Sequence, residues 1–95
     1  MELETNKIIV GAGLISLDVL IWDGQRVPIS YYVGGTCGNV MMILSHMGWD
    51  AYPIARLDGT KDGVRVLDDM KKHRVTTDFV STKDGKTPVI AQRNF

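Results

Sequence analysis

KIIVGAG, at residues 7–13, is the stretch that decides the expected fold. Three β-branched residues follow one another and glycines end the run, which is the pattern of a parallel strand buried on both faces. A second short apolar run, YPIARL at residues 52–57, predicts another core strand. Helical segments follow each run, so the order strand, helix, strand, helix predicts an α/β fold.

The two helical segments differ in their expected surroundings. Residues 39–47, NVMMILSHM, are rich in Met and Leu and apolar nearly all round, which predicts a buried helix that ends at Gly48. Residues 64–73 carry an apolar side chain at every third position among charged ones, which predicts an amphipathic surface helix. Asp62 is the candidate N-cap of this second helix.

Two β-hairpins are expected outside the parallel core. Residues 18–33 contain two β segments around an Asp-Gly pair, and residues 77–92 contain two more around the turn sequence KDGK. The second segment of the first pair alternates apolar and polar residues, so one of its faces is expected to be buried. The sequence therefore predicts a βαβα core with two β excursions.

Composition narrows the class of protein. The 95 residues include 11 Lys or Arg and 11 Asp or Glu, and the formal net charge of +0 argues against a nucleic-acid partner. Hydrophobic residues make up 44% of the chain, which is too much for a disordered protein. The longest apolar run, residues 40–44, is far too short to cross a bilayer. A single soluble domain without a membrane partner is expected.

Cysteine and histidine are sparse. Cys37 is the single cysteine and cannot form an internal disulfide. At the start of the expected helix it could have a lowered pKa and be reactive, but it is interpreted as a small packing residue. A zinc module is not expected because His46 and His73 lie far apart along the chain and no further thiol accompanies them. The acidic N-terminus lacks the basic and apolar regions of a signal peptide, which predicts a cytoplasmic protein.

The turn GGTCGN, at residues 34–39, is the best candidate for a ligand site. Glycines let a backbone approach a ligand closely, and the helix that follows would aim its free amides at it. Asn39 and Asp18 could hold hydroxyl groups, which makes a polyol site at the carboxyl ends of the strands. The alternative is that Asn39 merely caps the helix and Asp18 lies in a solvated turn, and the residues alone leave both open.

Two nucleotide-binding motifs are not supported. Gly11 and Gly13 follow the first strand, but the third glycine of a dinucleotide fingerprint would fall at Ser16. No P-loop sequence occurs either, since TKDGV follows Gly59.

Four segments together resemble a known family. They are GLISLD at residues 13–18, GGTCGN at 34–39, LSHMG at 44–48 and ARLDGTKDG at 55–63. They resemble the N-terminal third of the ribokinase-like (PfkB) carbohydrate kinases, and the resemblance covers essentially the whole chain. It implies part of a Rossmann-type α/β sandwich with a β-hairpin lid.

The resemblance also implies a site. A sugar or nucleoside would be held by Asp18, Gly34, Gly35 and Asn39, and Ser16 stands where ribokinases commonly have Asn. Within a partial domain spanning residues 1–95, the core would comprise about 7–17 and 34–76. The lid hairpins would comprise about 18–33 and 77–95, and lid-to-lid contact would form a homodimer.

The resemblance implies ATP and Mg²⁺ for a full-length enzyme, but neither can be assigned to residues here. The family's catalytic Asp lies in a GAGD turn, and that turn does not occur in these 95 residues. No catalytic residue is therefore expected in this chain. The expected function is the substrate-binding portion of an ATP-dependent carbohydrate or nucleoside kinase. The alternative is a truncated, non-catalytic binding or dimerisation module.

Overall fold

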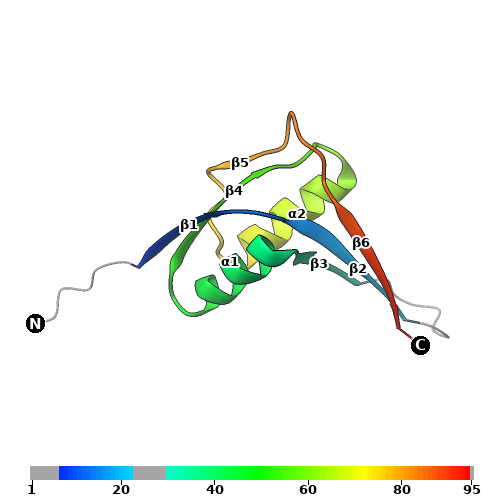
Figure 1. The fold of residues 1–95 in the computed structure, drawn as a ribbon, viewed down its shortest axis with the longest axis horizontal. Helices are drawn as coiled ribbons and strands as arrows, with labels where there is room; N and C mark the ends of the chain where they lie inside the picture. The colour runs from blue at the N-terminus through cyan, green and yellow to red at the C-terminus, as the bar shows by residue number, and fades with distance from the viewer. Residues whose placement is uncertain (1–6, 23–29, 95) are drawn as a thin grey trace, which may run out of the picture.

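The computed structural model describes residues 7–22 and 30–94 (Figure 1). This part of the chain forms two helices and six strands, and the strands are arranged in two small sheets. In chain order they are β1 (Ile8–Ala12), β2 (Ser16–Trp22), β3 (Ser30–Gly34), α1 (Thr36–His46), β4 (Asp50–Arg56), α2 (Lys61–Lys72), β5 (Val80–Ser81) and β6 (Val89–Asn94). The α/β fold class predicted from the sequence is confirmed.

The first sheet has the order β1-β4-β5 and is parallel throughout. Its register pairs Ile8 with Asp50 and Ala12 with Ile54. The prediction that β1 is buried on both faces is wrong, because exposed and half-buried residues alternate along it and Ile8 and Val10 remain exposed. The described helix α1 contacts β1 and β4 from one side, so the apolar run of β1 has one uncovered face.

The second sheet has the order β3-β2-β6. Antiparallel pairing of β2 with β3 confirms the strands of the first expected hairpin, whose Asp-Gly turn lies outside the described residues. β1 and β2 together form one long arc that passes from the first sheet into the second (Figure 1). A chain segment thus leaves the parallel core and enters the second sheet within a few residues.

The second expected hairpin does not form. β5 adds to β4 in the first sheet and β6 adds to β2 in the second, both in parallel, so the two segments belong to different sheets. The stretch between them bridges the sheets, because Gly85 N–H donates to the carbonyl of Leu57 and Thr87 N–H donates to the carboxylate of Asp58. The KDGK turn is therefore a crossing between sheets.

The core lies where the helices meet both sheets. Its fully buried side chains include Leu17, Leu57, Val66 and Met70. The amphipathic prediction for α2 is confirmed, since Val66 and Met70 face inward, but its N-cap is Thr60, whose hydroxyl accepts from Gly63 N–H at 3.5 Å. Asp62 instead lies in the first turn, where its charge favours the positive end of the helix.

Helix α1 is only half-buried, which corrects the prediction of a buried helix. Cys37, Gly38 and Met41 pack inward, whereas Val40 and Ile43 are exposed. The helix ends as expected, with Gly48 at a positive φ of 90° just after the C-cap residue. Within the described ranges, neither helix is long and apolar enough to cross a membrane.

Candidate functional site

Three elements meet at the bend between β1 and β2. Gly13 and Gly35 both have positive φ angles, and the bend carries the chain past the start of α1. The carbonyl oxygen of Leu14, in this bend, accepts from Cys37 N–H at 3.0 Å and from Gly38 N–H at 3.3 Å. The N–H groups of Cys37 and Gly38, at the start of α1, were expected to be free to bind a ligand. They are instead hydrogen-bonded within the protein.

A serine, an aspartate and a glycine come together on the second sheet. Ser16 and Asp18 share one face of β2, and the Ser16 hydroxyl donates to Asp18 Oδ1 at 2.8 Å. Ser16 is completely buried and Asp18 is half-buried. Opposite them in β3, the carboxyl group of Asp18 lies where a Cβ of residue 34 would be. Gly34 is thus required by the position of the Asp18 carboxylate.

The second position of the turn requires a glycine for a different reason. Gly35 is the N-cap residue of α1, and its φ of 81° is one that other residues rarely adopt. A Cβ at this position would also press against the backbone of Leu14. The pair Gly34-Gly35 is therefore fixed by two separate contacts, one with a carboxylate and one with a carbonyl.

The alternative interpretations, a solvated turn for Asp18 and a helix cap for Asn39, are both wrong. Asp18 lies within strand β2 and not in a solvated turn. Asn39 does not cap α1, since Gly35 is the N-cap and no side chain caps this end. Asn39 lies one turn into α1 with an exposed side chain. The structure thus brings Ser16, Asp18 and Gly34 together and leaves Asn39 on the surface of α1.

Sequence reasoning missed Tyr32. Strand pairing places Tyr32 directly opposite Asp18 on one side, and Ile90 of β6 beside Asp18 on the other. Both flanking side chains are exposed. Because residues paired across strands share a sheet face, the Asp18 carboxylate has an aromatic and an aliphatic neighbour. The alternation expected along β3 marked the opposite face, which carries Tyr31 and Val33, so no signal in the sequence analysis pointed to Tyr32.

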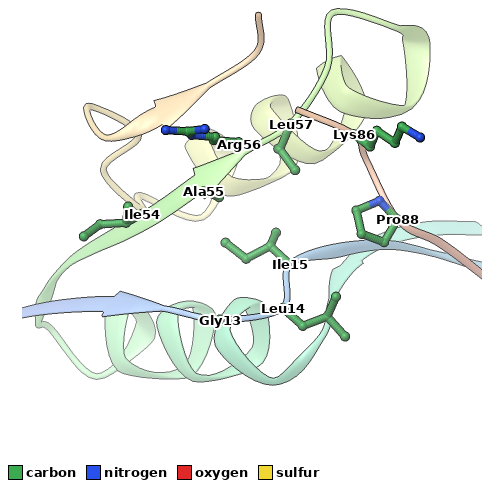
Figure 2. A pocket seen from close by; sticks show the side chains of 9 residues that line it. All are labelled: Gly13, Leu14, Ile15, Ile54, Ala55, Arg56, Leu57, Lys86 and Pro88. Atoms are coloured by element: carbon green, nitrogen blue, oxygen red, sulfur yellow. The ribbon is translucent and has the colours of Figure 1, made fainter. Parts of the chain in front are cut away.

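A cavity of about 280 Å³ lies at the carboxyl ends of β1 and β4. Figure 2 shows Ile15 and Leu57 pointing into it from opposite sides, whereas the charged ends of Arg56 and Lys86 point away. Open α/β sheets place their ligands beyond these strand ends. The side chains that point into this cavity are apolar, and Asp18 is not among the residues that line it.

Asp58 organises the edge of this cavity. Its carboxylate accepts from the hydroxyl of Thr60 and, at 2.9 Å, from the hydroxyl of Thr87. Hydrogen bonds, chiefly from Thr60 and then from Thr87, hold the pKa of Asp58 below its ordinary value against the opposing effect of desolvation. The aspartate therefore ties the end of β4 to the segment that crosses between the sheets.

Cys37 has the environment of a packing residue. Its side chain is buried against the core, and burial raises the pKa of the thiol. A protonated, buried thiol is a poor nucleophile. Among residues 7–22 and 30–94, no group of three or more His, Cys, Asp or Glu side chains could hold a metal ion.

No family model and no curated protein matches the sequence, but solved structures match its fold. A PfkB protein from Polaromonas sp. aligns with a TM-score of 0.79 at 17% identity, over 96% of this chain and 32% of its own. A 2-dehydro-3-deoxygluconokinase from Thermotoga maritima aligns with a TM-score of 0.72 at 26% identity, over 90% of this chain and 27% of its own.

A third match is aminoimidazole riboside kinase from Salmonella enterica, in complex with aminoimidazole riboside and an ATP analogue. Its TM-score is 0.75 at 20% identity, over 90% of this chain and 28% of its own. The chain thus spans about a third or less of the length of each structure. It has the fold of the N-terminal portion of a PfkB-family, ribokinase-like carbohydrate kinase, and the resemblance found in the sequence is confirmed.

Proposed function

We propose that this chain forms the substrate-binding portion of an ATP-dependent kinase that phosphorylates a hydroxyl group of a sugar or nucleoside. The observation that carries the proposal is the Ser16–Asp18–Gly34 cluster, in which a half-buried carboxylate lies against a turn without a side chain. Solved structures with this fold are described as sugar and riboside kinases, which supports the same class of substrate.

The Asp18 carboxylate is suited to hold hydroxyl groups. Oδ1 accepts the hydroxyl of Ser16, and this bond orients the group and leaves Oδ2 for a ligand. The exposed ring of Tyr32 offers an apolar surface next to the carboxylate, a combination that suits the mixed polar and apolar faces of a sugar. Asn39 and the backbone of Gly34 and Gly35 complete the proposed site.

In phosphoryl transfer these groups would position the acceptor, because enzymes catalyse this reaction mainly by positioning and charge stabilisation. Bound ATP would supply the phosphoryl group and Mg²⁺ would neutralise its charge. The described residues do not fit the Mg²⁺ ion of this step, since they contain no group of three or more His, Cys, Asp or Glu side chains that could hold a metal ion. We therefore assign to this chain only the binding and orientation of the acceptor.

The sheet β3-β2-β6 would act as a lid over the substrate. Tyr32 and Ile90, which flank Asp18 on one face of this sheet, are 51% and 45% exposed, and Val89 on the opposite face is 48% exposed. These exposed apolar side chains also favour the second candidate function, a non-catalytic dimerisation module. In both cases a second copy of the chain would pack against the sheet, and in the first case the face that carries Asp18 would stay open to the sugar. The two candidates differ in whether the Asp18 face binds a sugar.

Titration calorimetry with ribose, fructose and a riboside tests the proposal on the full-length protein. Replacing Asp18→Ala should weaken binding by about 1–3 kcal/mol, or roughly five- to 150-fold, because ligand hydroxyls lose their partner. The matched control is Asp68→Ala, which removes an exposed carboxylate from α2. Unchanged affinity in Asp18→Ala removes this residue from the site, and no binding by the wild type favours the dimerisation module.

A further inference from the structure

The two histidines of the chain meet at the ends of the two helices. His46 is the last residue of α1 and His73 is the C-cap of α2. Although they are 27 residues apart, His46 Nε2 lies 3.1 Å from His73 Nδ1. Two histidines that are distant along the chain are thus in contact, because both helices end at the same corner of the fold.

Neighbouring groups hold this corner in place. The hydroxyl of Ser45, in α1, donates to the backbone carbonyl of His73 at 2.8 Å. The other ring nitrogen of His73, Nε2, lies 3.4 Å from Asp69 Oδ1, and Asp69 Oδ2 accepts from Val33 N–H at 2.9 Å. His73 therefore has a carboxylate on one ring nitrogen and a second imidazole on the other.

We propose that His46 and His73 together bind one transition-metal ion of the class that prefers imidazole, such as Zn²⁺. Zinc binds imidazole nitrogen at about 2.0–2.1 Å. Two nitrogens 3.1 Å apart would therefore make an angle of about 100° at a zinc ion bound to both, which is close to the tetrahedral angle. The position of Asp69 matches the usual arrangement of a metal-bound histidine, whose second ring nitrogen donates to a carboxylate. The ion would take the place of the hydrogen bond between the rings.

The surroundings allow such an ion but limit its affinity. A polar cavity of about 290 Å³ lined by Ser45, both histidines, Lys72 and Arg74 leaves room for water to complete the coordination. The carboxyl ends of two helices contribute partial negative charge, and Asp69 contributes a full one. Lys72 and Arg74 oppose a cation, but both side chains are exposed and solvated. Two imidazoles without protein carboxylate ligands favour Zn²⁺, Ni²⁺ or Cu²⁺ over Mg²⁺ and Ca²⁺.

Calorimetric titration of the metal-free full chain with ZnCl₂, at neutral pH in a non-chelating buffer, tests the site. One Zn²⁺ per chain should bind, MgCl₂ should not, and His46→Gln and His73→Gln should each lower Zn²⁺ affinity at least about tenfold. Asp69→Asn should lower it by about 10–100-fold, the usual effect of losing an outer carboxylate. Asp68→Asn, the same charge change at the adjacent exposed residue, should leave it unchanged.

Wild-type Zn²⁺ affinity in both histidine variants would overturn the proposal, as would the absence of binding by the wild-type chain. Circular dichroism reports whether each variant is folded. A second measurement needs no variant: electron paramagnetic resonance of the chain with one equivalent of Cu²⁺ should show two coupled imidazole nitrogens. A spectrum with one nitrogen or none would also overturn the proposal.

Discussion

Replacing Gly34→Ala should destabilise the protein through the carboxylate of Asp18. Gly34 does not have a positive φ, so alanine meets no backbone obstacle there. Its Cβ would instead occupy the position of the Asp18 carboxyl group, which must rotate away. Rotation breaks the bond from Ser16, whose hydroxyl is completely buried, at a cost of about 1–3 kcal/mol.

Two further effects set the net magnitude. Overpacking by the new Cβ in the sheet would add about 1–3 kcal/mol to this loss of stability. Alanine also restricts the unfolded chain more than glycine does, which returns about 0.4–1 kcal/mol to the folded state. The free energy of unfolding should therefore fall by about 1–5 kcal/mol, measured by urea denaturation with circular dichroism at matched protein concentrations.

A double-mutant cycle identifies the cause. In an Asp18→Ala background the carboxyl group is absent, so adding Gly34→Ala should cost almost nothing, and the coupling energy should equal nearly the whole loss of about 1–5 kcal/mol. Gly59→Ala is the matched control, because its Cβ would make only an ordinary 3.4 Å contact with Thr82 O. An equal loss from Gly34→Ala with and without Asp18 would refute the reasoning.

Three other properties follow from single contacts. The buried Cys37 thiol, whose pKa is raised by desolvation, should react with iodoacetamide at neutral pH much more slowly than in urea, and equal rates would contradict its burial. The pKa of Asp58 is lowered in the folded state, so its contribution to stability is complete above the ordinary Asp pKa and is lost as the pH falls through the folded-state pKa. Acid unfolding curves of Asp58→Asn should lack this pH-dependent loss of stability. The exposed Ile8, Val10, Ile54 and Phe79 should make the 95-residue chain self-associate. Val10→Lys should reduce association in sedimentation velocity more than Val64→Lys on α2, and a wild-type monomer at all concentrations would show that this face does not associate.

Much of the local structure could be predicted from the residues. Helix α2 carried its apolar spacing in the sequence, and the glycines of residues 34–35 marked the turn before α1. The parallel pairing of β1 and β4 followed from two apolar runs separated by a helix. These features depend on neighbours within a few residues or on one crossover, which is why periodicity and composition were sufficient.

The errors arose where distant segments compete for one strand. KDGK is a good hairpin turn by itself, but β4 and β2 each offered an open edge to one of the flanking segments. A local pattern cannot show which edge is available. Burial of β1 and α1 was overestimated for a related reason, since an apolar run predicts that a face can be covered and not which element covers it.

The position of the candidate site depends on a contact that local sequence cannot predict. Val33 precedes the glycine turn, and its N–H on the outer edge of β3 is bonded to Asp69, 36 residues away on α2. Val33 is buried, so an unpaired amide there would be costly. Asp69 therefore fixes the strand that delivers Gly34 to Asp18, while its second oxygen faces His73. An ion bound at the histidine pair would orient the same carboxylate, so the metal site and the glycine turn are joined through Asp69.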